Sequence, residues 1–404
     1  MIPRALLEAA LHIVALIAGI FCVFGVLWDA FQTIILPRRA TGVVRLTRMF
    51  YIATWAPWSY VIRRIRTPRT RETALSFYGP LSLILLLALW AAGMILGFGL
   101  IYFSLGVPFY DLRQHPGFLS DLYISGATIF TLGPTDAGPL HLLARWLMVL
   151  ESGTGFAFLA IVMGYFPVLY SAFSRREVSI SLLDARAGSP PTAAELMRRH
   201  VHPDAAEALS VLLIEWERWS AELLESHISF PLLCYFRSQH TNQSWLAALT
   251  SILDTSSLLI AGVRGHEARQ AQLTFAMARH ALVDLTQVLG LKPLRDASDR
   301  LPPEGYTELY NLLCQSGVSV CRDDRSYERL TEMRRLYEPW AEALSAHFVM
   351  PLPTWIPAAA HRDNWLAVAR VRESAESANP PAAPIAGEGH THTLAELHDD
   401  HHDF

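Results

Sequence analysis

Three long apolar segments dominate the chain, and a shorter patterned segment lies between the second and the third. The long segments run from Ala9 to Trp28, from Leu75 to Leu105 and from Leu140 to Phe173. Each reaches the roughly 20 residues that a helix needs to cross a bilayer. Beyond residue 178 apolar positions recur at helical spacing, and no segment alternates as a strand does. The pattern predicts an all-α membrane protein with three transmembrane helices, followed by an all-α cytosolic domain.

The later helical segments are separated by short runs that contain Gly or Pro. They span residues 204–228, 244–261, 267–289, 306–314 and 323–348. Thr192 and Glu195 have the spacing of a capping box and mark an earlier helix start. After residue 374 the chain is rich in Ala, Pro, Gly, Glu and His, a composition typical of disorder.

Arginine is concentrated on one side of the apolar segments. Nine arginines lie between residues 38 and 71, and Arg175 and Arg176 follow the third apolar segment. The connection at 107–116 contains only Arg113. By the positive-inside rule, the N-terminus lies outside and the C-terminus in the cytoplasm.

The interfacial segment is expected between the first two spans. Residues 43–65 combine arginines at both ends with aromatic residues inside, as in a helix that lies in the headgroup plane. Pro57 is expected to divide this helix into two pieces. A voltage sensor would instead need arginines at three-residue spacing inside a spanning helix. Asp29, at the end of the first span, is interpreted as an interfacial charge within reach of water.

Composition supports a membrane protein and narrows its function. The chain is 52% hydrophobic and 17% charged, whereas soluble domains carry about a quarter charged residues. A net charge of −4 argues against a nucleic-acid partner.

The cysteines, at 22, 234, 314 and 321, lack metal-type CxxC spacing and fit reduced thiols. Lys292 is the only lysine, a bias typical of a GC-rich bacterial genome, so we expect a bacterial inner (plasma) membrane. No nucleophile–base constellation favours an enzyme.

The segment between the second and third spans, residues 118–139, carries the chemistry. A short amphipathic stretch of about eleven residues precedes the polar turn T-L-G-P-T-D at residues 131–136. Such a helix is too short to cross a bilayer, and irregular backbone at membrane depth needs protein or a water-filled cavity around it. Ser120 is expected to cap the helix, with Asp121 against its positive dipole end. This arrangement predicts a re-entrant pore helix and a loop whose carbonyl oxygens face a cation.

The turn resembles the filter motif T-x-G-Y-G-D of the pore-loop cation channels related to potassium channels. Thr131, Gly133 and Asp136 match, and the resemblance extends over the flanking helices, residues 76–174. It implies a potassium-channel-like pore domain, a homotetramer in the lipid bilayer, and permeant K⁺ or other monovalent cations in the filter, with no other cofactor. The expected filter residues are Thr131, Leu132, Gly133, Pro134, Thr135 and Asp136.

The expected domains are 1–36 (first transmembrane helix), 37–74 (arginine-rich interfacial segment), 75–174 (outer helix, pore loop 118–139 and inner helix), 175–373 (cytosolic helical domain) and 374–404 (His-rich tail).

The turn departs from the family motif in its outer half. Pro134 has no N–H and a fixed φ, and the β-branched Thr135 resists positive φ. In the family the tyrosine braces the filter, and the second glycine takes a backbone geometry that other residues resist. We therefore expect a potassium-permeable pore with weak discrimination against sodium. The alternative is a non-conducting membrane sensor or scaffold, in which the loop only stabilises the helix bundle.

Glu151 is an acidic residue within the third span, where a charge must be paired or hydrated. One interpretation is a cation-attracting or gating residue in or behind the pore. The other is a buried brace that accepts hydrogen bonds from the pore helix, from Ser125 or Thr128. The sequence leaves both open.

Glycine and proline mark further candidate gating positions on the inner helix. Gly153 and Gly155 form a flexible patch, and Gly155 lies near the family's hinge, although glycine also serves close helix packing. Gly164 and Pro167 are expected to kink the helix near a cytoplasmic gate. A helical domain joined directly to this helix can transmit the signal of a cytosolic ligand or partner, which the sequence does not name.

Titratable residues elsewhere raise the question of a metal site. Glu215, His227, His240 and Asp254 match no metal-site spacing and are interpreted as solvated or hydrogen-bonded residues. The tail contains His398, His401 and His402 among aspartates, donors that zinc or nickel accept. This signal is compositional only, so no metal site is predicted.

Overall fold

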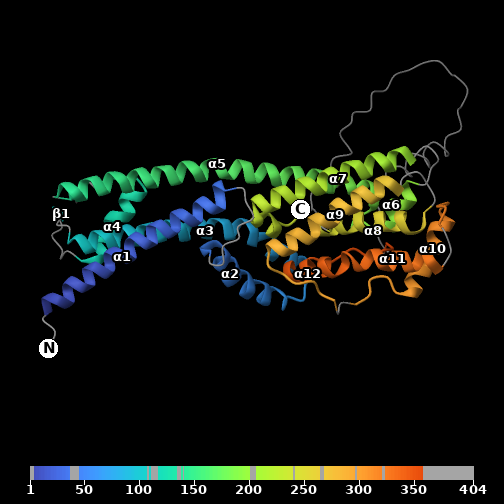
Figure 1. Ribbon diagram of the computed structural model, residues 1–404, viewed down its shortest axis with the longest axis horizontal. Coiled ribbons are helices and arrows are strands. Elements are labelled where there is room, and N and C mark those ends of the chain that lie inside the picture. Colours follow the sequence, from blue (N-terminus) through green and yellow to red (C-terminus); the bar gives the residue numbers. More distant parts are fainter. Residues whose placement is uncertain are drawn as a thin grey trace, which may run out of the picture. The chain divides into compact units, whose positions relative to one another are not determined.

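Nearly all regular structure in the described part of the chain is helical (Figure 1). The computed structural model describes residues 4–36, 45–106, 109–110, 117–133, 138–139, 141–200, 206–239, 242–263, 268–295, 298–320 and 324–357. The first 359 residues form one compact unit, and a second unit, Ala360–Phe404, lies outside the described residues. The chain therefore has the all-helical fold that the hydrophobic pattern predicts.

Within the described residues, four helices are long and apolar enough to cross a membrane. Three of them, α1 (Arg4–Ala30), α3 (Pro68–Leu105) and α5 (Leu142–Ala187), correspond to the predicted spans. The most apolar 18-residue stretches of these three helices are only 17%, 39% and 22% buried, so wide apolar surfaces remain for contact with lipid. The fourth, α8 (Trp245–Gly262), was not expected as a candidate span; its 18-residue stretch is 89% buried, so it has almost no apolar surface left for lipid.

The first two long helices pack closely along one another. A Cβ added to Gly19 of α1 would lie 2.6 Å from the carbonyl oxygen of Gly97 on α3. A Cβ on Gly97 would lie 2.6 Å from Val23. Glycine at both positions therefore lets the two backbones approach. Beyond α1 the chain continues in a π-helical turn, η1 (Phe31–Ile35).

The arginine-rich segment forms one continuous helix, α2 (Leu46–Ile62), with Pro57 inside it. The prediction of two pieces is therefore wrong. Proline costs a helix about 3 kcal/mol, but packing of the aromatic side chains holds α2 together. The Trp55 ring is buried, with centroids 4.7 Å from the ring of Tyr78 and 5.1 Å from that of Tyr235.

Asp29 is not an interfacial charge within reach of water, because it is only 4% exposed. Its carboxylate accepts hydrogen bonds from the backbone N–H of Thr47 at 3.1 Å, the Thr47 hydroxyl at 2.5 Å and Trp90 Nε1 at 2.9 Å. Thr47 lies in the first turn of α2, where backbone N–H groups lack helical partners and the dipole attracts an anion. Asp29 thus joins α1, α2 and α3.

The C-terminal helices surround α8. Leu336 and Tyr337 divide the predicted helix 323–348 into two, because Pro339 in the first turn of the second helix cannot donate a backbone hydrogen bond. The helices are α6 (Ala193–Arg199), α7 (Ala206–Ser229), η3 (Pro231–Tyr235), α9 (Ala268–Val288), α10 (Pro303–Gln315), α11 (Asp324–Arg335) and α12 (Glu338–Phe348). Their hydrophobic core also includes Trp55 of α2 and Tyr78 of α3.

Candidate functional site

The candidate site is built on α4 (Phe118–Ile129), a twelve-residue helix that contacts both α3 and α5 (Figure 1). Two glycines allow this approach. A Cβ on Gly99 of α3 would lie 2.8 Å from the Leu122 side chain, and a Cβ on Gly155 of α5 would lie 2.2 Å from the carbonyl oxygen of Ile129. Gly155 is therefore a close-packing position inside a continuous helix, and the hinge there stays a prediction.

The start of α4 differs from the predicted cap. The N-cap residue is Gly117, no side chain caps the helix, and the backbone N–H of Ser120 itself donates to the Gly117 carbonyl at 2.8 Å. The predicted Ser120 cap is therefore wrong by one turn, since the helix begins two residues before Ser120. Asp121 does lie in the first turn, where it is buried.

Glu151 holds α4 from the side of α5. Its side chain is fully buried; Ser125 Oγ donates to Oε1 at 2.5 Å, and the Tyr102 hydroxyl of α3 donates to Oε2 at 2.6 Å. Ser125 also lies within 3.1 Å of the Ile95 carbonyl. Thr128 instead donates to the carbonyl of Ile124 within α4. This geometry matches the brace alternative, and it adds a partner, Tyr102, that the sequence did not indicate.

The C-terminal end of α4 is a Schellman cap. The Leu132 N–H donates to the Ala127 carbonyl at 2.8 Å, and the Thr131 N–H donates to the Thr128 carbonyl at 3.0 Å. Thr131 consequently has φ +55°, a conformation that β-branched residues rarely adopt. Gly133 follows with φ +64°.

The loop beyond the cap presents carbonyl oxygens. The backbone N–H groups of Thr131 and Leu132 are used in the cap, whereas no described residue donates to the carbonyls of Thr131, Leu132 or Gly133. These three residues are exposed. Strand β1 (Phe109–Tyr110) precedes α4 in the chain and strand β2 (Gly138–Pro139) follows it, and the two strands pair antiparallel with each other. The remaining filter candidates, Pro134, Thr135 and Asp136, lie outside the described residues.

The other inner-helix candidates lie on an open surface of α5. A Cβ added to Gly153 or Gly164 would meet no atom within 4 Å, so neither glycine is needed for packing within one chain. Pro167 lies inside α5, which remains one helix from Leu142 to Ala187.

Arg176 joins α5 to the C-terminal helices, although the sequence indicated only a charge on the cytoplasmic side. Its guanidinium is buried and donates to the carbonyls of Leu233 and Phe236, each at 2.9 Å. His227 Nε2 lies 3.2 Å away. Burial, together with the charge of Arg176, lowers the pKa of His227 well below its usual value, so this imidazole is neutral at pH 7. The signal in the sequence was only the pair Arg175 and Arg176 at the end of the third apolar segment.

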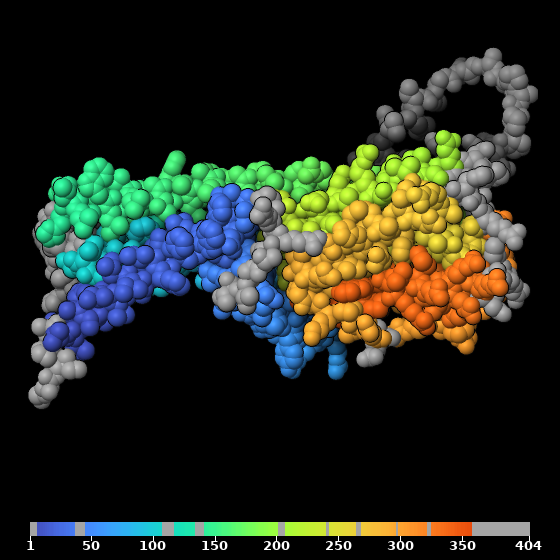
Figure 2. Space-filling view, viewed as in Figure 1, coloured from blue at the N-terminus to red at the C-terminus, as the bar shows by residue number. Residues whose placement is uncertain are grey.

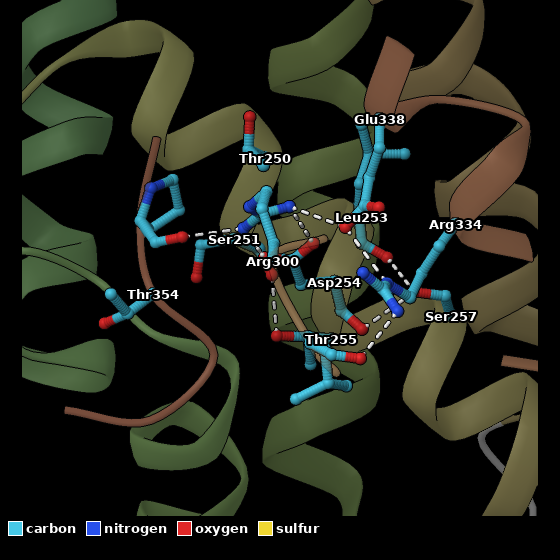
Figure 3. A network of polar contacts seen from close by, with 12 residues as sticks. Thr250, Ser251, Leu253, Asp254, Thr255, Ser257, Arg300, Arg334, Glu338 and Thr354 are labelled. Atoms are coloured by element: carbon cyan, nitrogen blue, oxygen red, sulfur yellow. Dashed lines mark hydrogen bonds and ion pairs between the residues drawn. The ribbon is translucent and has the colours of Figure 1, made fainter. Parts of the chain in front are cut away.

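The residues considered for a metal site have other partners. Asp254, on α8, is fully buried, and Arg300 binds its carboxylate at 2.6 Å (Figure 3). The Tyr337 hydroxyl also donates to this carboxylate, at 2.5 Å. Although burial opposes its charge, Asp254 and Glu338 raise the pKa of Arg300. Glu215 is exposed opposite Arg186. The described residues contain no cluster that could hold a metal ion. His240, His398, His401 and His402 lie outside them.

Comparison with known proteins supports the membrane assignment. The chain is 24% identical over 233 residues to the uncharacterized membrane protein YdjJ of Bacillus subtilis (strain 168), covering 57% of this chain and 67% of that protein. No family profile matches the chain, and no solved structure matches it. Together with its apolar helices, this similarity identifies the chain as a membrane protein with transmembrane helices.

Proposed function

We propose that the chain is one subunit of a homotetrameric pore-loop cation channel that conducts K⁺ and other monovalent cations passively. One observation carries this proposal: α4 ends in a cap that uses the N–H groups of Thr131 and Leu132 and leaves three consecutive carbonyls without a described donor. Carbonyl oxygens can replace the water shell of a cation without a fixed charge that would trap it. In this arrangement α4 is the pore helix, and its negative end faces the ion path.

Assembly follows from the exposed apolar surface around the loop. Phe130, Leu132 and Trp146 are 58%, 75% and 66% exposed in the single chain. One loop cannot surround an ion, and four copies related by cyclic symmetry close the ring. The open surfaces at Gly153 and Gly164 then belong to subunit contacts or the pore lining.

Gating is proposed to act through α5, whose cytoplasmic end is held by Arg176. The C-terminal helices would lie in the cytoplasm, with the N-terminus outside, as the arginine distribution predicts. A ligand or partner that moves η3 (Pro231–Tyr235) would then move α5, because Arg176 binds carbonyls at the end of η3.

Ion flux through liposomes tests the proposal. Purified protein in sealed liposomes should dissipate a potassium gradient, and bilayer recordings in mixed potassium and sodium should give reversal potentials of a weakly selective pore. Gly133→Asp should abolish the flux, because it adds a side chain and a charge where φ is positive. Equal leak from wild type and Gly133→Asp would contradict the channel proposal.

The second candidate is a non-conducting membrane sensor or scaffold. The Schellman cap favours it, because capping alone accounts for the positive φ of Thr131. A scaffold would show no flux in either gradient, and Gly133→Asp would leave its function unchanged.

A further inference from the structure

A large cavity lies where the spanning helices meet the C-terminal helices, away from the candidate filter. Its volume is about 910 Å³, within the range of small-molecule sites. Residues of η1, α2, α3, α5, η3 and α12 line it, together with the C-terminal ends of α7 and α9 and the segment that follows α9. The blue residues of α2 and the gold and orange residues of the C-terminal helices adjoin in Figure 2.

The floor of the cavity is apolar and buried. Leu83 and Leu86 of α3, Tyr165 of α5 and Leu232 of η3 line it, and each is less than 9% exposed. Such a surface suits a hydrocarbon chain, and it excludes a ligand that is charged throughout.

The mouth of the cavity is basic. Arg48 of α2, the α2 cap residues Arg45 and Arg63, and Lys292 after α9 line it, and its described lining contains no acidic residue. No ion pair joins any of these four cations to a described carboxylate. Arg45 donates to Thr33 Oγ1 at 3.0 Å, while Arg48 approaches Gly290, with Nη2 3.0 Å from the position of an added Cβ.

Three polar atoms in the lining are buried without a partner among the described residues: Arg45 Nε, the Tyr51 hydroxyl and His347 Nε2. Buried polar groups are nearly always hydrogen-bonded in folded proteins, and an exception points to an unseen partner. Burial and the nearby Arg63 lower the pKa of His347 to about 4. The imidazole is therefore neutral at pH 7 and can donate a hydrogen bond without adding charge.

We propose that this cavity binds an anionic phospholipid, with its phosphate at Arg45, Arg48 and Lys292 and an acyl chain along Leu83 and Leu86. A neutral apolar ligand does not account for four cations that pair with no described carboxylate, and a free anion does not account for the apolar floor. Clusters of basic residues on the cytoplasmic side of membrane helices attract anionic headgroups. The bound lipid contacts Tyr165 on α5 and the α2–α12 junction at once, so it stabilises the connection between the spanning and C-terminal helices. This inference does not depend on ion conduction.

Lipid binding to the purified full-length chain in a neutral detergent tests the proposal. Native mass spectrometry counts bound phosphatidylglycerol and phosphatidylcholine per chain. Wild type is expected to retain phosphatidylglycerol in preference. The double variant Arg48→Gln/Lys292→Gln should weaken its binding about tenfold or more, since each cation near a phosphate contributes roughly a factor of five to ten. Both residues are exposed, so the variant leaves the core intact.

A matched control removes the same charge elsewhere. Arg329→Gln/Arg335→Gln changes two exposed arginines of α11, outside the cavity, and should leave lipid binding unchanged. Leu87→Trp, which fills the floor, should displace phosphatidylglycerol, whereas excess inorganic phosphate should not. Equal binding of the two lipids, equal loss in the control, or displacement by inorganic phosphate alone would overturn the proposal.

Discussion

At the scale of single residues, Glu151 shows how a membrane helix bundle accommodates a carboxylate. One carboxylate oxygen accepts a hydrogen bond from the Tyr102 hydroxyl of α3, and the other accepts one from the Ser125 hydroxyl of α4. Hydrogen bonds to a buried carboxylate are stronger than neutral ones, and they fix the position of α4 relative to α3 and α5. Glu151 therefore stabilises the packing of α4 against α3 and α5, and this role does not depend on any role near a pore.

A double-mutant cycle tests this brace. Glu151→Leu and Tyr102→Phe each remove the 2.6 Å hydrogen bond, and each should lower the free energy of unfolding by about 1–3 kcal/mol. The double variant should lose less than the sum, with a coupling of about 1–2 kcal/mol, measured by denaturation in detergent. Additive losses would contradict a direct interaction.

Gly155→Ala tests the close approach of α4 and α5. The added Cβ meets a backbone carbonyl at 2.2 Å, so the helices must separate, and the unfolding free energy should fall by about 1–3 kcal/mol. Gly153→Ala is the matched control, because open space surrounds it and alanine favours the helix by up to about 1 kcal/mol. Equal melting midpoints for the two variants would argue against the packing.

His347 makes stability depend on pH. The pKa of His347 is about 4 in the folded protein and about 6.5 in an unfolded chain. Between about pH 4 and pH 6.5 the imidazole is therefore protonated mainly in the unfolded state. Stability should therefore fall as pH decreases from 7 to 4, by about 2 kcal/mol at pH 5. His347→Gln should remove this component, measured as melting midpoints at pH 7 and pH 5. An unchanged pH dependence in the variant would exclude His347 as its source.

At the scale of elements, α5 connects the two parts of the chain. It continues without a break from the helices around α4 to Arg176, whose guanidinium binds the carbonyls of Leu233 and Phe236. A continuous helix transmits displacement, and a buried arginine that binds two carbonyls fixes its end. The cytoplasmic-side end of α5 as the sequence predicts it is therefore bound directly to the end of η3.

Arg176→Met should break this connection. The carbonyls of Leu233 and Phe236 lose their donor in a buried site, and the unfolding free energy should fall by about 2–4 kcal/mol. Arg175→Met, at the exposed neighbouring position, should change it by less than about 0.5 kcal/mol. Denaturation in detergent compares them, and similar losses would show that the geometry at Arg176 is unimportant.

At the scale of the whole molecule, one hydrophobic core extends across the predicted domain boundaries. Trp55 of α2 and Tyr78 of α3 belong to the same cluster as Tyr235 and Phe348 of the C-terminal helices. The spanning helices and the C-terminal helices should therefore unfold together at this junction, because neither part completes the core alone.

Trp55→Ala tests that cooperation. The lost ring should destabilise the protein by about 3–5 kcal/mol and speed amide hydrogen exchange in both α2 and α12. Met49→Ala, on the exposed side of the same helix, should leave exchange in α12 unchanged. Faster exchange in α2 alone would show two independent cores.

The local features could be predicted from the order of the amino acids alone: three long apolar helices, the short helix before residue 131 and the C-terminal helices. Length, periodicity and apolar content are properties of neighbouring residues, so the chain displays them directly. The predictions of a Ser120 cap on α4 and of a break at Pro57 were wrong, because packing outweighs local preference at these positions.

Which polar groups meet depends on the packing of the helices in the folded chain. Asp29 binds Trp90 across 61 residues, Tyr102 binds Glu151 across 49, and Arg176 binds the Phe236 carbonyl across 60. The basic cavity likewise combines segments from η1 to α12. Hydrogen bonds depend on distances of about 3 Å, and folding sets those distances between residues whose spacing in the sequence carries no trace of them.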